Sequence, residues 1–455
     1  MSIEIKRITA GPKHHLFGFH DLVQTNAKGD LALSLEVDNI SHPPLPGETC
    51  LSGVVSSCGG EFMPVHKTHT WNYPQGARQQ WIGESDLFTC NDRDDKGSLI
   101  SHICDGRHRE VKERLPFPVH CLSGNHAFFF NYDRIHSVGG YGYKPMQKCP
   151  TNKLKEDLPN DDGLFVGDIY SKKHHLLVSI SDIASCGEKG PVKTGYPHYV
   201  THAVLNPAGT RIAFLHRYRV VDGGETTRLM TIGVDGRGLR CLGKGFLSHF
   251  TWISNDELLI WGENQYALSA FRESPYLRIP GVLQGMLLAK KIMRGLRGLR
   301  KSSISNSNFV QRKAFLKIKD DDSGVVDKIA LGVLKEDGHP MSRPGELTFL
   351  INDTYPDSNG DRTLMFYDVA NNKRTDIGKY RMVFESPNCE SFDLDAAKSS
   401  MDRRVLKKSN LKDFLFYRSG YHCDLHPRWS ADGKIAFFDS IHEGSRQIYS
   451  VTGLL

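Results

Sequence analysis

The stretch 204–215 reads VLNPAGTRIAFL, and a matching stretch, PRWSADGKIAFF, occupies 427–438. Each has a short apolar segment, a turn rich in Asn, Asp, Ser and Gly, and a second apolar segment. This pattern predicts a β-hairpin, because these turn residues allow the chain reversal that lets two apolar strands pair. Weaker copies occupy 250–260 and 122–130, and three more hairpins begin near Phe19, Gln75 and His339, with second strands at 31–37, 86–91 and 347–352. The chain therefore contains seven predicted hairpins.

Further apolar segments follow the hairpins, for example at 229–234 and 364–369. Four short strands in each of seven repeats predict an all-β fold, a single seven-bladed β-propeller over residues 1–455. Only one strand, at 446–451, remains after the last hairpin, and the unpaired N-terminal segment 3–8 would complete that blade. Such a closure removes a free sheet edge and holds the ring shut. A β-sandwich followed by a second β domain is the alternative architecture.

Three segments interrupt the repeats, at about 41–68, 272–325 and 382–420. In the second, apolar residues of 283–301 fall near one helical face, and six of the residues 290–301 are basic. Such a basic amphipathic helix can lie on an anionic membrane surface. The alternative is a solvated helix that covers the side of the propeller, with its glycines lowering helix stability.

The composition restricts the class of protein. A hydrophobic fraction of 39%, with 23 Phe and 16 Tyr, permits a sizeable core and excludes wholesale disorder. No apolar run reaches the length of a transmembrane helix, and the N-terminus lacks the apolar segment of a secretory signal. The ten cysteines include no CxxC pair and are interpreted as buried or free thiols. We therefore expect a cytoplasmic protein, peripheral to the inner membrane face if 283–301 binds lipid.

The charge restricts the partners. The net charge of +6 is too small to indicate nucleic acid, but it suits an anionic small molecule or an acidic glycan. No Gly-rich phosphate loop, no G-x-S-x-G motif and no glycosidase-like pair of acids stands out. The 21 histidines are the most informative residues.

Reactive side chains concentrate where a propeller's first strands begin and its second strands end, and these positions surround one funnel. The first-strand positions carry His14, His15, His20, Arg78, His120, His198, His202, His249, His339, His422, Cys423 and His426. The second-strand positions carry Glu36, Asp38, Asn91, Asp92, Arg93, Tyr132, Arg134, His216, Arg217, Asp353, Tyr355 and Asp439. Any one of them can make a structural hydrogen bond, but the whole set predicts a binding or catalytic funnel.

One group in the funnel has the composition of a metal site. The predicted ligands are His249, His339, Cys423 and His426, which come from the neighbouring fifth, sixth and seventh blades. Histidine and cysteine are typical zinc ligands. Four such ligands would make the site structural, whereas three would leave a position open for catalysis.

A second group suits chemistry on a uronic acid. The predicted catalytic residues are His202, His216, Arg217, Arg134 and Tyr143, and the predicted substrate-binding residues are His20, Arg78, Tyr141, His198 and Tyr355. Arginine offers a fork for a carboxylate and makes the adjacent C–H more acidic, while histidine and tyrosine accept and donate protons. One of these groups would remove the proton, and another would protonate the leaving glycosidic oxygen.

The last repeat, HCDLHPRWSADGK at 422–434 with FDSIHEGSRQIY at 438–449, resembles the final blade of the seven-bladed propeller polysaccharide lyases. This group includes oligogalacturonate, ulvan and rhamnose–glucuronate lyases. The segments WNYPQGARQQW at 71–81, SHFTW at 248–252, GHP at 338–340 and NDTYPD at 352–357 are also similar to the group and its uncharacterised relatives. The resemblance implies β-elimination by His, Tyr and Arg, and a metal that is either structural zinc or a substrate-contacting manganese. Cys423 favours zinc, with manganese as the second choice.

The predicted function is therefore a lyase-like enzyme that cleaves a uronic-acid-containing oligosaccharide by β-elimination. The alternatives are a non-catalytic propeller that binds glycan or protein, and a glycan-modifying transferase, both in cell-surface polysaccharide synthesis. The missing export signal and the basic segment 283–301 favour the binding propeller.

Overall fold

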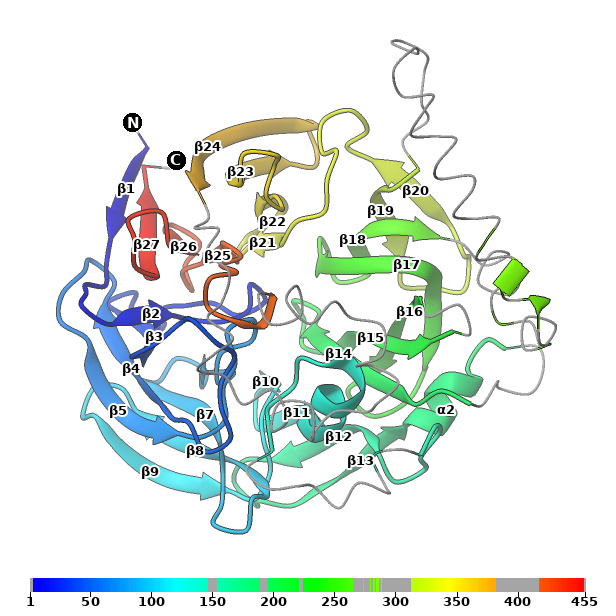
Figure 1. The fold of residues 1–455 in the computed structure, drawn as a ribbon, viewed down its shortest axis with the longest axis horizontal. Helices are drawn as coiled ribbons and strands as arrows, with labels where there is room; N and C mark the ends of the chain where they lie inside the picture. The colour runs from blue at the N-terminus through cyan, green and yellow to red at the C-terminus, as the bar shows by residue number, and fades with distance from the viewer. Residues whose placement is uncertain are drawn as a thin grey trace.

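The computed structural model describes residues 3–145, 154, 156–188, 195–220, 224–264, 273, 279, 281, 282, 284, 285, 288, 312–381 and 417–453. Over these ranges the strands form seven blades that follow one another around a closed ring (Figure 1). The predicted all-β, seven-bladed propeller is confirmed, and the sandwich alternative is wrong. No helix in these ranges is both long and apolar enough to cross a membrane.

Each of the first three blades is a four-stranded antiparallel sheet. Blade 1 contains β2 (His14–Leu16), β3 (Leu31–Val37), β4 (Cys50–Ser56) and β5 (Met63–Thr68). Blade 2 contains β6 (Gln80–Trp81), β7 (Leu87–Arg93), β8 (Leu99–Asp105) and β9 (Glu110–Leu115). Blade 3 contains β10 (Cys121–Ser123), β11 (His126–Phe130), β12 (Gly163–Asp168) and β13 (His174–Ser179). The helical segments α1 (Tyr132–Arg134), η1 (Ile135–Gly139) and α2 (Ile180–Ser185) belong to its connections.

Blades 4 and 5 share a long strand, β17, which leaves one blade and enters the next. Blade 4 contains β14 (His198–Leu205), β15 (Arg211–Arg219), β16 (Glu225–Gly233) and the first part of β17 (Arg240–Trp252). Blade 5 contains the rest of β17, β18 (Glu257–Asn264), β19 (Ala314–Lys319) and β20 (Val326–Ile329). Blade 6 contains β21 (Met341–Arg343), β22 (Glu346–Asp353), β23 (Asp361–Asp368) and β24 (Lys373–Arg381).

The two chain ends meet in blade 7, as predicted. This blade contains β25 (Arg428–Trp429), β26 (Ala436–Ser440), β27 (Gln447–Thr452) and, as its outermost strand, β1 (Glu4–Arg7). The antiparallel register pairs Glu4 with Thr452 and Arg7 with Tyr449, and β1 lies beside β27 in Figure 1. The N-terminal strand thus covers an edge that would otherwise expose unpaired backbone groups.

The expected insertion at 41–68 is instead largely part of blade 1, because it contains β4 and β5. The outer strand β5 is half-exposed and includes Pro64, so it lacks the apolar run of an inner strand. Residues 312–325 of the second predicted insertion likewise include β19. Apart from residues 284, 285 and 288, the predicted basic helix at 283–301 lies outside the described residues, and so does most of 382–420.

A repeated tryptophan contact joins neighbouring blades. Trp81, Trp252 and Trp429 end inner strands of blades 2, 5 and 7, and all three are buried. Each indole N–H donates to an inner-strand carbonyl of the preceding blade, at 3.0 Å to Gln24, 3.0 Å to Val204 and 3.2 Å to Met341. A buried indole needs such an acceptor. The contact therefore fixes how adjacent inner strands face the central channel.

Candidate functional site

One polar, largely buried residue from each blade lies near the axis of the propeller. These residues, the channel ring, are His20, Arg78, His120, His202, His249, His339 and His426. Contacts across the ring show that they converge, since the His20 imidazole lies 5.8 Å from that of His249 and 5.3 Å from that of His339, centroid to centroid. The three histidines come from blades 1, 5 and 6. Blade 1 is not adjacent to blades 5 and 6, so the three imidazoles can meet only near the propeller axis.

Distorted backbone aims several of these side chains inward. Arg78, His202 and His426 have left-handed φ angles of 51°, 58° and 41°. The register of β14 shifts between Thr201 and Val204, and that of β17 shifts at the corresponding place, between Leu247 and Phe250. A bulge turns a side chain away from its alternating position, and a left-handed non-glycine residue costs about 1–3 kcal/mol. Such strain is typical of functional sites.

Four imidazoles of the ring pack closely, and we call His20, His249, His339 and His426 the imidazole cluster. The ring centroids of His249 and His339 lie 4.2 Å apart, and those of His339 and His426 lie 4.5 Å apart. Burial and the neighbouring imidazoles hold the pKa of His20 and His426 well below its usual range. Both rings are therefore neutral near pH 7.

Backbone carbonyls determine the tautomer of two of these histidines. His20 Nδ1 lies 3.1 Å from the carbonyl oxygen of Pro340, and His426 Nδ1 lies 2.8 Å from that of Gly18. A carbonyl can only accept, so Nδ1 carries the proton in both rings. Each Nε2 consequently keeps the lone pair that a metal ion requires.

In His339 and His249, the other two members of the imidazole cluster, a carboxylate takes the place of the carbonyl at Nδ1. His339 Nδ1 lies 2.7 Å from Asp353 Oδ1, and His249 Nδ1 lies 3.1 Å from Asp337 Oδ1. Burial lowers the pKa of His339, but Asp353 outweighs this and raises the pKa overall. The surroundings of this ring therefore favour a positive charge at Nε2, whether a proton or a metal ion. A carboxylate behind a histidine is the usual arrangement for metal-ligating imidazoles.

Asp424 adds an oxygen ligand. Its carboxylate and the imidazoles of His339 and His426 offer ligand atoms that all lie within 4.8 Å of one another. Burial opposes the charge on Asp424, but His422 and Arg362 outweigh it and hold the pKa of the carboxyl well below its usual range. A charged carboxylate beside two imidazoles fits a divalent metal such as zinc or manganese.

The predicted ligand Cys423 does not join this group. Its side chain is 1% exposed and packs in the hydrophobic core with Tyr73 and Phe437. Asp424 and His426 face the channel, whereas Cys423 and Leu425 both belong to core clusters. The alternation of polar and apolar residues over 422–426 is the sequence signal that would have identified Asp424 in place of Cys423.

A second set of polar atoms lacks partners, and we call Tyr141, His202 and Arg217 the Tyr–His–Arg group. Within the described ranges, Tyr141 Oη, His202 Nδ1 and Arg217 Nε are buried and have no hydrogen-bond partner. The rings of Tyr141 and His202 lie 5.9 Å apart, centroid to centroid. Buried polar atoms are rarely left unpaired, so these three point to a ligand or ordered water between them.

The electrostatics give these groups distinct protonation states. Burial and the Arg217 charge hold the pKa of His202 well below its usual range, so its imidazole is neutral. Burial raises the pKa of Tyr141, which keeps its hydroxyl protonated. The Arg217 guanidinium, 3.6 Å from Glu225 Oε1, stays charged. A base, an acid and a cation are thus present together.

Both sets line the same channel. The Phe19 ring lies 4.8 Å from the His202 imidazole and 5.1 Å from that of His426, centroid to centroid. Tyr355, a predicted substrate-binding residue, lies 5.6 Å from His339 at the edge of the imidazole cluster. A ligand in the funnel would therefore meet both sets.

Two arginines that were predicted to act in the site form hydrogen bonds with other residues of the protein instead. Arg78 makes a bidentate pair with Asp21, at 2.7 and 3.1 Å, and also donates to the carbonyl of His120. Arg134 donates to the carbonyls of His198, Leu154 and Glu156. Neither guanidinium has a group available for a substrate carboxylate, so both act as supports.

Three other predicted residues are also internal. The His216 imidazole is 0% exposed, accepts from Arg228 and donates to His198 Nδ1 at 2.9 Å. Tyr143 is 0% exposed and stacks on Tyr132 at 4.3 Å. His216, His198 and Tyr143 therefore contact other side chains of the protein in place of the predicted substrate.

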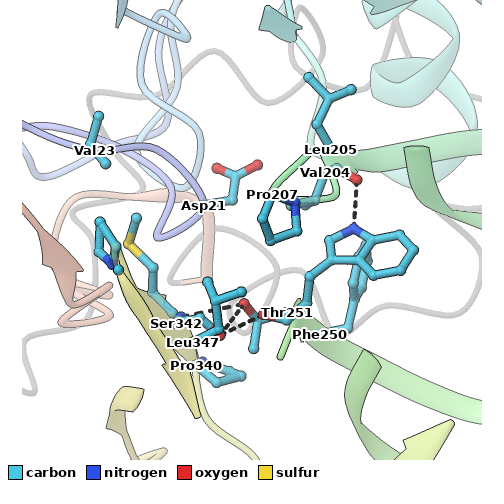
Figure 2. Close-up of a pocket in the computed structure, with 14 residues that line it drawn as sticks. Asp21, Val23, Val204, Leu205, Pro207, Phe250, Thr251, Pro340, Ser342 and Leu347 are labelled. Atoms are coloured by element: carbon cyan, nitrogen blue, oxygen red, sulfur yellow. Dashed lines mark hydrogen bonds between the residues drawn. The ribbon is translucent and has the colours of Figure 1, made fainter. Parts of the chain in front are cut away.

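A cavity of about 410 Å³ lies beyond the ring (Figure 2). Its lining includes Asp21, Val204, Thr251 and Met341, which follow ring residues along their strands, and the rest is mostly apolar. None of the channel-ring residues lines it. Its mostly apolar wall does not suit an acidic sugar, so the candidate site is the ring together with the Tyr–His–Arg group.

The fold and the ring define a class, a seven-bladed β-propeller with a histidine-lined channel. No family model matches the chain, and no curated protein matches it. Among solved structures, the oligogalacturonate lyase of Vibrio parahaemolyticus aligns with 99% of this chain and 96% of its own, at 10% identity and a TM-score of 0.51. This likeness shows a shared fold.

Two further structures align at lower scores. An oligogalacturonate lyase in complex with manganese covers 98% of this chain and 92% of its own, at 11% identity and a TM-score of 0.39. The β-propeller domain of the Trilobed protease from Pyrococcus furiosus covers 97% and 96%, at 8% identity and a TM-score of 0.44.

Proposed function

We propose that this protein is a lyase-like enzyme that cleaves a uronic-acid-containing oligosaccharide by β-elimination in the funnel. The observation that carries the proposal is the Tyr–His–Arg group, whose three buried polar atoms lack partners in the described residues. An oligogalacturonate lyase has the same fold, but the chemistry is argued from the site.

The protonation states match the steps of an elimination. Arg217 binds the uronate carboxylate and stabilises the negative charge that develops there. Neutral His202 takes the proton from the carbon next to the carboxylate, and the electron pair of that C–H bond forms the new C=C bond. The glycosidic C–O bond breaks, and the leaving oxygen takes the hydroxyl proton of Tyr141.

The imidazole cluster and Asp424 fit a divalent metal. His339, His426 and Asp424 would hold it, with His20 and His249 beside them. When bound, the metal would supply a fixed positive charge near the substrate carboxylate. The preference for zinc rests on Cys423, and without that thiol the nitrogen and oxygen ligands suit zinc and manganese alike.

The test is the ultraviolet absorbance of the unsaturated uronate that elimination leaves on the product. Purified protein, with and without chelator, is incubated with oligogalacturonate and with glucuronate-containing oligosaccharides. His202→Ala should lower the rate by about 10²–10⁴-fold, because it removes the base. Arg217→Met should lower kcat/KM by about 10–150-fold on uronates, because it removes a charged hydrogen bond worth about 1.5–3 kcal/mol.

The matched controls are a methyl-esterified substrate and His108→Gln, an imidazole 71% exposed on a distant turn. The ester should show little loss in Arg217→Met, and His108→Gln should act like the wild type. His202→Ala with full activity would refute the site. Binding of uronate oligomers without any absorbance change, in wild-type protein, would instead favour a non-catalytic glycan-binding propeller.

A further inference from the structure

A second group of metal-type side chains lies between blades 1 and 2, outside the channel ring. His66 belongs to β5, Asp92 lies near the end of β7, and His102 belongs to β8. The strands β7 and β8 are neighbours in blade 2, whereas β5 is the outermost strand of blade 1. The group therefore spans a blade boundary.

The three side chains converge on one point. His66 Nε2 lies 2.8 Å from Asp92 Oδ2, and His102 Nε2 lies 3.7 Å from the same oxygen. All three ligand atoms lie within 4.8 Å of one another, and the two imidazole centroids are 4.4 Å apart. Ligand atoms at about 2.1 Å around a tetrahedral zinc are separated by about 3.4 Å. The two observed distances from Asp92 Oδ2, 2.8 and 3.7 Å, lie on either side of this value.

The carboxylate is held in place from its other side. Asp92 Oδ1 accepts from the backbone N–H of His69 at 2.9 Å, the backbone N–H of Arg93 at 2.8 Å and Thr68 Oγ1 at 3.2 Å. The single hydroxyl hydrogen of Thr68 is also directed at the carbonyl of Asn91, at 2.7 Å, so the two backbone donors fix the orientation of the carboxylate and leave Oδ2 directed at the two imidazoles. Ordered hydrogen bonds behind a ligand are what a metal site requires.

A simple His66–Asp92 hydrogen bond explains only part of this arrangement. That bond uses one imidazole, but His102 also directs Nε2 at the same oxygen, at 3.7 Å. A third imidazole, that of His69, lies with Nδ1 3.5 Å from Asp92 Oδ1. Three imidazoles around one buried carboxylate are the ligand types of zinc.

We propose that His66, Asp92 and His102 bind a zinc ion that fastens blade 1 to blade 2, with His69 as a candidate fourth ligand. The proposal is independent of the funnel chemistry, because none of these residues belongs to the channel ring or the Tyr–His–Arg group.

The chain offers a matched control. Asp105, His108 and Glu110 also bring metal-type atoms together, but on a tight turn where His108 is 71% exposed. This turn group lies in blade 2, but it has one imidazole and two carboxylates, and Glu110 is exposed as well as His108. We expect no zinc there.

The experiment measures zinc per chain by elemental mass spectrometry, after the full-length protein is treated with chelator, reloaded with zinc and desalted. His102→Gln should hold about one zinc fewer than the wild type, and His108→Gln should equal the wild type. Zinc should also raise the Tm of the metal-free wild type more than that of His102→Gln. Equal zinc contents in folded wild type and His102→Gln would overturn the proposal.

Anomalous diffraction at the zinc edge, from wild-type crystals soaked in zinc, needs no variant. A peak between His66, Asp92 and His102 supports the site, and its absence there refutes it. Lyase activity is followed in parallel, since His102→Gln should keep it whether or not the funnel also holds a metal.

Discussion

A buried group of three charges holds blade 7 against blade 1. Asp439 lies between Arg428 and Arg446, and the three residues are 0%, 0% and 1% exposed. Asp439 Oδ1 accepts from Arg428 at 2.6 Å, and Oδ2 accepts from Arg446 at 3.3 Å and from the backbone N–H of Phe17 at 3.3 Å. The substitution Asp439→Asn keeps the volume but leaves two buried cations without their counter-ion.

The expected cost follows from these contacts. Removing one partner of a buried ion pair costs about 3–5 kcal/mol. The cost should fall near the lower end, because Arg428 also donates to Gln24 and to the carbonyl of His426, at 2.6 and 2.8 Å. A loss of about 3–4 kcal/mol is a large part of the 5–15 kcal/mol that stabilises a typical domain.

Urea denaturation followed by tryptophan fluorescence measures this loss as a lower midpoint. The control is Arg7→Gln, which removes a surface pair with Glu443 in the same blade, where the side chains are 43% and 46% exposed. An exposed pair of this kind is worth about 0–1 kcal/mol. If Asp439→Asn costs no more than Arg7→Gln, the buried group does not stabilise the closure and the reasoning is wrong.

Three further predictions concern the metal, the pH dependence and the closing strand. Cys423→Ala should leave the metal content of the funnel unchanged, because the thiol packs in the core; metal analysis showing a loss would restore Cys423 as a ligand. Burial raises the pKa of Asp162 from 3.8 to about 6, so the native state binds this proton more tightly than the unfolded chain, and ionised Asp162 lowers stability as the pH rises through that interval. Asp162→Asn should therefore gain roughly 1–3 kcal/mol relative to the wild type between about pH 4 and pH 7 in urea titrations, and a constant difference would contradict the assignment. Deleting residues 1–8 should lower the Tm and cause concentration-dependent association on size exclusion, because β27 would become an open edge; an unchanged monomer would show that β1 is dispensable.

The blades were predictable because their turns are determined locally. In the hairpin at 204–215, Asn206 Oδ1 accepts from the backbone N–H groups of Thr210 and Arg211, at 2.8 and 3.0 Å. In the hairpin at 427–438, Ser430 Oγ makes the same kind of contacts with Lys434 and Ile435. Turn chemistry within about five residues is visible in the sequence. The outer strand β5 was missed because it is half-exposed and carries little apolar signal.

The sequence predicted which types of residue gather in the site, but not which of them are available to bind a substrate. Of the arginines expected to meet a carboxylate, Arg78 is occupied by Asp21, 57 residues away, and Arg134 by the carbonyl of His198, 64 residues away. Arg217 is the one whose Nε keeps no partner in the described chain. Residue type shows what a side chain can do, whereas its burial and partners show whether it is available.

The propeller, its closure by the N-terminal strand and the histidine-rich funnel follow from local patterns, because hairpin turns and apolar alternation act over a few residues. The imidazole cluster depends on the closed ring, since the tautomer of His426 is determined by Gly18, 408 residues away, and that of His20 by Pro340, 320 residues away. Such partners meet only after all seven blades have closed around the axis. The chemistry of the funnel is therefore a property of the folded ring, whereas the ring itself is encoded blade by blade.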